Sequence, residues 1–208
     1  IQQRHFATRG KDTTTSMGVR AAQMAMEKAH IAKEDIDFLI FATLSPDYYF
    51  PGCGVLAQRE LGLNTVGALD IRNQCSGFIY ALSVADQFIK TGMYKNILVI
   101  ASEMQSPALD LTTRGRNMAV LFGDGAGAAV LSRSEKQGKG ILSSHLHSEG
   151  AHAEELAIIT PGVGKKWVTD LLKENDPEDT SYFPYMNGQF VFKNAVVRFS
   201  EVIMEALK

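Results

Sequence analysis

The sequence predicts an α/β fold with a largely parallel central sheet, and two patterns within its 208 residues support this. Segments with apolar residues at three- and four-residue spacing, typical of amphipathic helices, alternate with short runs of strand-forming residues. The run 36–43 is apolar almost throughout, as expected for a strand that is covered on both faces. Alternation of this kind is typical of parallel strands connected by helices.

The first helix is expected at residues 15–30, because Met17, Ala21 and Met24 share one face after a threonine-rich start that can cap it. Proline opens and glycine closes the next helix, at Pro51 and Gly62. The following expected elements are a strand at 66–71, a helix at 76–91 with the apolar face Phe78, Leu82, Ala85 and Ile89 that ends at Gly92, and a strand at 96–102.

The pattern changes beyond Pro107. Residues 118–131 read as a strand interrupted by glycines that permit a close backbone approach, and residues 141–147 as another strand. Residues 165–182 are charged and contain helix breakers, and 191–207 form an amphipathic helix with no strands after it to pack on. These features predict a first unit at 1–164, an exposed linker at 165–182 and the start of a truncated second unit at 183–208.

Composition excludes several classes of protein. The 21 Lys and Arg residues against 23 Asp and Glu residues leave a net charge of −2 without a basic cluster, so nucleic acid is not an expected partner. The longest apolar runs are far shorter than the ~20 residues of a membrane-spanning helix, and no signal peptide is recognisable. Two cysteines, Cys53 and Cys75, suit free thiols in a reducing cytosol. A cytoplasmic protein is therefore expected.

Cys75 is the strongest candidate for chemistry. It lies between the strand at 66–71 and the helix at 76–91, where free N–H groups and the helix dipole favour a thiolate. The small residues Ser76 and Gly77 leave room for a substrate carbonyl to approach the sulfur. A buried structural cysteine remains the alternative from this triplet alone.

Three other groups of residues are assigned no chemistry. Cys53 is expected to pack in the core, because no other reactive residue points to it. The glycine-rich segment 123–127 has neither the Lys-Ser/Thr of a phosphate loop nor a dinucleotide fingerprint. His145, His147 and His152 lack a zinc-binding spacing, so no metal is predicted.

Several motifs, taken in their order along the chain, resemble the 3-oxoacyl-[acyl-carrier-protein] synthase III family. They cover nearly the whole sequence. The matching segments are 1–5, Thr43 to Asp47 with Phe50 and Pro51, the block 70–92 around Cys75, Arg114, 121–131, 145–150, 186–188 and 191–193.

The resemblance implies a thiolase-like layered αβαβα fold, of which this chain holds the N-terminal half and the start of the C-terminal half. It implies an acyltransferase of fatty acid biosynthesis that accepts an acyl group from acyl-CoA and condenses it with malonyl-ACP, with decarboxylation, to give 3-oxoacyl-ACP. Acyl-CoA and malonyl acyl carrier protein would be its substrates, no cofactor would be needed, and the enzyme would be a homodimer.

The resemblance also implies roles for individual residues. Cys75 matches the acyl-accepting nucleophile, whose own N–H would be one oxyanion donor. Arg114 matches a residue at the nucleotide end of coenzyme A. The positions that line or approach the acyl pocket are Phe50, which reaches across the dimer interface, Leu121, Phe122, Met186, Gly188 and Phe192.

The family's catalytic histidine, in a His-Gln-Ala-Asn motif, and its catalytic asparagine have no counterpart in these 208 residues, so the chain is expected to be incomplete. Two other interpretations stay open: a synthase III relative of secondary metabolism, and a non-catalytic partner subunit with the same fold.

Overall fold

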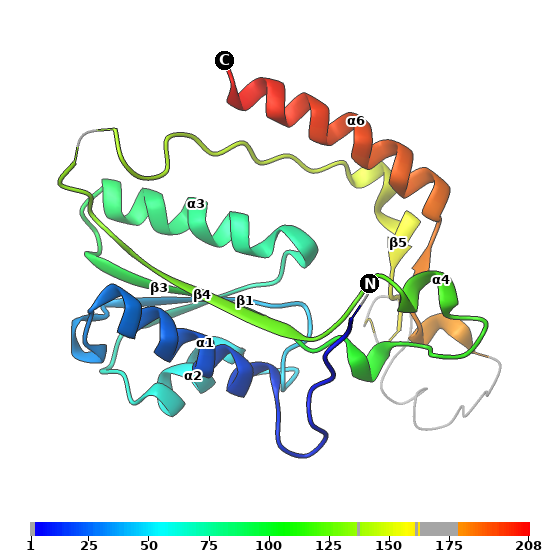
Figure 1. Ribbon diagram of the computed structural model, residues 1–208, viewed down its shortest axis with the longest axis horizontal. Helices are drawn as coiled ribbons and strands as arrows, with labels where there is room; N and C mark the ends of the chain where they lie inside the picture. Colours follow the sequence, from blue (N-terminus) through cyan, green and yellow to red (C-terminus); the bar gives the residue numbers. More distant parts are fainter. Residues whose placement is uncertain (1–2, 137, 161, 163–178) are drawn as a thin grey trace. The chain divides into compact units, whose positions relative to one another are not determined.

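The computed structural model describes residues 3–136, 138–160, 162 and 179–208 (Figure 1). The chain divides into two compact units. The sheet unit consists of Gln2–Gln105 and Gly123–Ser144, and the helix unit of Ile1, Ser106–Phe122 and His145–Lys208. The predicted linker at 165–182 lies largely outside the described residues, so the division 1–164, 165–182 and 183–208 stays a prediction.

Four strands form the sheet in the order β2-β1-β3-β4. Their bounds are β1 Phe38–Ala42, β2 Gly67–Ile71, β3 Asn96–Glu103 and β4 Gly125–Ser132. β1 pairs in parallel with both β2 and β3, whereas β4 runs antiparallel to β3. Every residue of β1 is buried, which confirms the predicted central strand.

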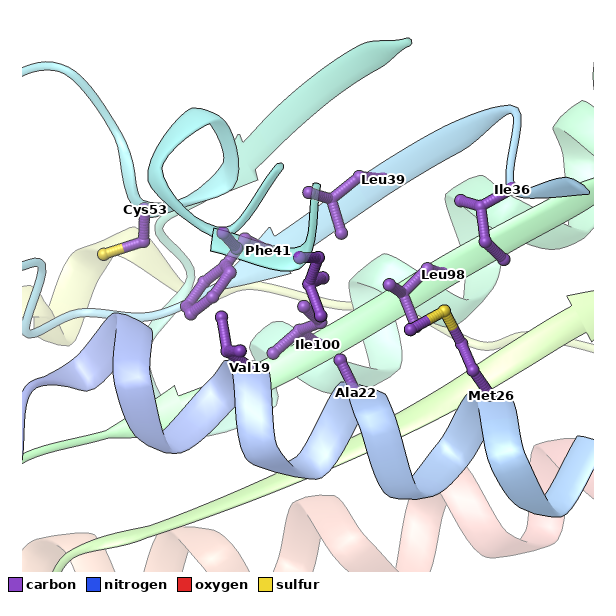
Figure 2. Close-up of a cluster of buried hydrophobic side chains, with 11 residues drawn as sticks. Val19, Ala22, Met26, Ile36, Leu39, Phe41, Cys53, Leu98 and Ile100 are labelled. Atoms are coloured by element: carbon purple, nitrogen blue, oxygen red, sulfur yellow. The ribbon is translucent and has the colours of Figure 1, made fainter. Parts of the chain in front are cut away.

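Helices α1 (Thr14–Ala29) and α2 (Cys53–Leu61) cover one face of this sheet (Figure 1). Thr13 caps α1 in a capping box, as the threonine-rich start predicts. Side chains of both helices pack on β1 and β3 (Figure 2). This core contains Val19, Ala22, Met26, Ile36, Leu39, Phe41, Cys53, Ala57, Leu61, Leu98 and Ile100.

Helix α3 (Gly77–Lys90) covers the opposite face of the sheet (Figure 1). Ala81 and Ala85 are buried against β1 and β3, and Phe78 and Ile89 pack beside them. The packed face is thus shifted from the predicted one, because Leu82 is not part of this cluster and Ala81 is. Two small alanines let the helix approach the sheet closely.

Four local predictions need correction. The strand predicted at 118–131 is confirmed only from Gly125, because a short helix, Arg116–Ala119, covers the start of that range. Helix α2 begins at Cys53 after the N-cap Gly52, two residues later than Pro51. Gly125 and Gly127 show no close backbone approach, because β4 is an edge strand and a Cβ at either position would have no neighbour within 4 Å. Residues 141–147 form no strand, because no strand of the described chain pairs with them.

The described part of the helix unit has less regular structure. Its elements are the helices α4 (Arg116–Ala119) and α6 (Gly188–Ala206), the paired strands β5 (Leu156–Ala157) and β6 (Tyr185–Met186), and 3-10 turns at Ser106–Ala108, Gly150–Glu155 and Thr180–Tyr182. Helix α6 confirms the helix predicted at 191–207 and begins three residues earlier. Among the described residues, no helix has the length and apolar character needed to cross a bilayer.

We expect Leu39→Ala to lower the free energy of unfolding by about 2–5 kcal/mol, because it removes a β1 side chain that is 0% exposed and leaves a cavity. The matched control is Leu142→Ala, at a side chain that is 79% exposed, with an expected change within about 0.5 kcal/mol. Urea denaturation followed by far-UV circular dichroism measures both. Equal changes in the two variants would contradict the assigned core.

Candidate active site

Cys75 lies at the junction between β2 and α3, as predicted. It is the middle residue of a 3-10 turn, Gln74–Ser76, that leads directly into α3. The thiol is free and exposed, whereas the thiol of Cys53 is free and buried. No side chain caps the start of α3, so Cys75 lies beside N–H groups that lack a helical acceptor.

The backbone around Cys75 is sharply turned. Gln74 has a φ of 22°, a left-handed value that a residue with a side chain rarely adopts. Gly77 follows with so little space that a Cβ there would lie 3.3 Å from the Cβ of Ala42. The turn is therefore held closely against the end of β1, with the Cys75 side chain left in solvent.

Parallel strands bring their carboxyl ends to one edge of a sheet, and Cys75 follows the end of β2 at that edge. A half-buried carboxylate, Glu103, ends β3 at the same edge. It accepts hydrogen bonds from Leu44 N at 2.8 Å, Ser45 Oγ at 2.8 Å and Gln105 Nε2 at 3.3 Å. Glu103 thus fixes the first residues after β1.

This network reaches the strand that leads to Cys75. Thr43 N donates to the carbonyl oxygen of Ile71, the last residue of β2, at 3.1 Å. Ser45 Oγ, already bound to Glu103, accepts from Met104 N at 2.9 Å. The segments after β1, β2 and β3 are therefore linked by hydrogen bonds at one edge.

Burial raises the pKa of the Glu103 carboxyl above its ordinary value, against the opposing effect of the hydrogen bonds from Leu44 and Ser45. Sequence reasoning missed this residue. Glu103 is a single acidic residue at the end of an apolar strand, and its partners Ser45 and Leu44 lie 58 and 59 positions away.

Arg114, predicted to bind the nucleotide end of coenzyme A, lies in the helix unit. Its Nε donates to Asp110 Oδ2 at 2.6 Å, and its guanidinium carbon lies 4.6 Å from the centre of the Phe183 ring. Asp110 also accepts from the hydroxyl and the amide of Thr112. The hydroxyl of Thr112 and the guanidinium together lower the pKa of Asp110 to about 2.

The guanidinium of Arg114 is thus oriented on two sides and remains about half exposed. The ion pair between Asp110 and Arg114 could have been recognised from the sequence, because the two residues are four positions apart. The contact with Phe183 could not, because Phe183 lies 69 positions after Arg114. An arginine on an aromatic ring can present its other face to a planar or anionic group.

The predicted pocket residues fall in both units. Phe50 belongs to the sheet unit with Cys75. Met186 ends β6, two residues before Gly188 at the start of α6, and a Cβ on this glycine would lie 3.4 Å from Met186 Cε. Leu121 and Phe192 are exposed, and Phe122 is partly buried. That these residues line an acyl pocket stays a prediction.

The three histidines considered as metal ligands do not lie on a strand, and each contacts a side chain of α6. His145 Nδ1 and His147 Nε2 lie 2.9 and 2.7 Å from the two carboxylate oxygens of Glu205. These hydrogen bonds lower the pKa of Glu205. The ring of His152 lies 4.6 Å from that of Phe190, tilted by 57°. Within the described residues, no three His, Cys, Asp or Glu side chains are grouped to hold a metal ion.

Comparison with known proteins finds relatives that share one description. A profile described as 3-Oxoacyl-[acyl-carrier-protein (ACP)] synthase III matches residues 69–150. A beta-ketoacyl-[acyl-carrier-protein] synthase III of Ehrlichia canis (strain Jake) is 41% identical over 207 residues, which cover 100% of this chain and 60% of that protein. The chain is thus similar over its whole length to synthase III proteins, and it spans about 60% of the length of the curated relatives it matches.

Solved structures support the thiolase-like α/β fold of this chain. The synthase III of Aquifex aeolicus VF5 superposes with a TM-score of 0.82 at 39% identity, covering 97% of this chain and 57% of that one. A priming beta-ketosynthase from the R1128 polyketide biosynthetic pathway superposes with a TM-score of 0.74 at 31% identity, covering 93% and 54%. Both confirm the predicted fold class.

We expect Glu103→Gln to change how the stability of the protein depends on pH. Because the pKa of Glu103 is raised on folding, the unfolded chain loses this proton first as pH rises. Its contribution to stability is therefore fully present below the ordinary value of 4.5 and is lost as pH rises through the folded pKa. The glutamine variant lacks this loss.

Urea denaturation at several pH values from about 4 upward measures the effect. The control is Glu60→Gln, at an exposed carboxyl on α2. The prediction fails if the difference in stability between wild type and Glu103→Gln does not vary with pH, or if Glu60→Gln gives the same variation.

Proposed function

We propose that this protein is a condensing enzyme that accepts an acyl group from acyl-CoA on Cys75 and joins it to malonyl-ACP to give 3-oxoacyl-ACP, at the start of fatty acid synthesis. The single observation that carries the proposal is the exposed thiol of Cys75 at the uncapped start of α3. Similarity to synthase III proteins over the whole length of this chain supports the same reaction class.

In the first step, the Cys75 thiolate attacks the thioester carbonyl of acyl-CoA. A bond forms between sulfur and the acyl carbon, and the carbonyl oxygen becomes an oxyanion that backbone N–H groups at the helix start can stabilise. The carbon–sulfur bond to coenzyme A then breaks, and coenzyme A leaves as a thiolate that takes up a proton. Cys75 is left as a thioester.

In the second step, malonyl-ACP loses carbon dioxide, and the resulting enolate carbon attacks the Cys75 thioester. The new carbon–carbon bond gives 3-oxoacyl-ACP and returns the Cys75 thiolate. The enolate oxygen needs hydrogen-bond donors. We assign these to the family's His-Gln-Ala-Asn motif and catalytic asparagine, which do not occur among these 208 residues.

The remaining parts of the proposal concern partners and place of action. Arg114, oriented by Asp110 and Phe183, would bind the nucleotide of acyl-CoA. Phe50, whose side chain is 82% exposed, would enter the acyl pocket of a second copy in a homodimer. The two free cysteines suit the cytoplasm, and the reaction requires no cofactor.

Acetyl-CoA should add one acetyl group to the protein that the complete gene encodes, and Cys75→Ala should abolish this adduct, because it removes the attacking sulfur. Intact-mass spectrometry after incubation measures the addition. Cys53→Ala is the matched control, since Cys53 is buried and its variant should keep the adduct. An adduct that survives in Cys75→Ala would refute the nucleophile.

Arg114→Lys should raise the KM for acyl-CoA about tenfold, because an ammonium replaces a planar cation held against Phe183. The same acyl group on N-acetylcysteamine, which has no nucleotide, should be transferred at the wild-type rate. Steady-state kinetics with the two donors make the comparison. Equal losses with both donors would exclude a role in nucleotide binding.

A second candidate is a related ketosynthase of secondary metabolism, which the likeness to the polyketide-priming ketosynthase favours. A panel of straight and branched acyl-CoA primers, with the products identified by mass, separates it from fatty acid initiation.

A third candidate is the non-catalytic partner subunit. It is tested by reading the coding region beyond Lys208: a downstream His-Gln-Ala-Asn motif supports the enzyme, and a stop codon favours the partner subunit.

A further inference from the structure

An exposed aromatic segment connects β1 to α2. Tyr48, Tyr49 and Phe50 are 54%, 76% and 82% exposed, and Pro51 completes the segment, which we name the aromatic arch (residues 48–51). Burying a side chain of this size stabilises a protein by about 1.5–3 kcal/mol. Three consecutive exposed side chains therefore leave much of this stabilisation unused. Exposed apolar groups that gather in this way mark a contact surface.

The arch is held at the end where it leaves β1. Asp47, the residue before it, accepts hydrogen bonds from Thr14 N at 2.8 Å and Thr15 N at 3.1 Å, at the start of α1. The hydroxyl of Thr14 also donates to the carbonyl oxygen of Ser45 at 2.6 Å. These contacts fix the entry to the arch in the sheet unit.

The opposite end is held by Asp70, a residue of β2. Its Oδ1 accepts from Gly54 N at 2.9 Å, and its carboxylate also accepts from the amide of Cys53. The residue before α2, Gly52, supplies no side-chain cap, so Asp70 performs this role from another element.

The two glycines here show how closely Asp70 approaches. A Cβ on Gly54 would lie 2.8 Å from Asp70 Oδ2, and a Cβ on Gly52 would overlap the same carboxylate. Both positions therefore need glycine while Asp70 caps the helix. Partial burial of the carboxyl against this helix start raises the pKa of Asp70, although the residue as a whole is exposed.

We propose that Asp70 is a positioning residue that anchors the aromatic arch and thereby determines which acyl groups the site accepts. This inference rests on the proposed function, in which Phe50 lines the acyl pocket. Asp70 acts through the backbone: it holds Cys53 and Gly54, these hold Pro51, and the direction of Phe50 follows. It touches no substrate.

The test uses Asp70→Asn in the protein that the complete gene encodes. The amide group keeps one acceptor but places an N–H group against the donors of Cys53 and Gly54. The matched control is Asp37→Asn, because Asp37 also accepts two backbone hydrogen bonds, from Lys95 N and Asn96 N, at the opposite edge of the sheet. A second variant, Gly54→Ala, displaces the carboxylate while leaving it charged.

The first measurement is amide hydrogen exchange of residues 47–54, which needs no catalysis. We expect faster exchange in Asp70→Asn and Gly54→Ala than in wild type and Asp37→Asn. The second is kcat/KM for acetyl-CoA and for longer acyl-CoA primers. We expect the ratio between primers to change on the order of tenfold in the two arch variants, since small displacements near a reacting group cost up to about a hundredfold.

The proposal is overturned if hydrogen exchange of residues 47–54 is unchanged in the arch variants. It is also overturned if exchange is faster but the ratio of kcat/KM between primers is unchanged. An equal loss of kcat/KM with every primer overturns it too, because Asp70 would then act on Cys75. If Asp70→Asn fails to fold, Gly54→Ala decides. If wild type transfers no acyl group, the proposed function and the primer selection both fall, and hydrogen exchange still shows whether Asp70 anchors the arch.

Discussion

The parallel pairing of β1 with β2 and β3 is the constraint on which the candidate site depends. It aligns Ala42 with Ile71 on one side and with Ala101 on the other. The segments that follow the three strands must therefore emerge at one edge. Every residue of β1 is buried, so a shift of register would change which side chains face α1 and which face α3. Packing of the core therefore fixes the register, and the register fixes the position of Cys75 after β2.

At that edge the chain needs acceptors for N–H groups that no longer pair within the sheet. Glu103 serves the segment after β1, and Asp70 serves the start of α2. A buried amide without an acceptor costs about 1–3 kcal/mol, which exceeds the usual net gain from one hydrogen bond. For Glu103 and Asp70, loss of solvent outweighs the hydrogen bonds and raises the pKa. For Asp110, the hydrogen bonds outweigh loss of solvent and lower the pKa.

Local sequence patterns were sufficient to predict the elements that nearby residues define. The apolar run in β1, the threonine cap of α1 and the glycine at the end of α2 each lie within a few residues of the element they define. The predicted strand at 141–147 was wrong because a strand needs a partner, and a local pattern cannot supply one. The contacts of Asp70 with Gly54 and of Arg114 with Phe183 join separate elements, so the sequence carried no signal of them.

Two helices begin at the same edge of the sheet, and each begins next to a cysteine. At α2, Asp70 caps the helix start and the core encloses Cys53, whose pKa is raised chiefly by burial. At α3 no side chain caps the helix, and Cys75 is exposed. The two thiols therefore differ in access: Cys53 lies in the core beside a helix start that Asp70 caps, whereas Cys75 is exposed beside a helix start without a side-chain cap.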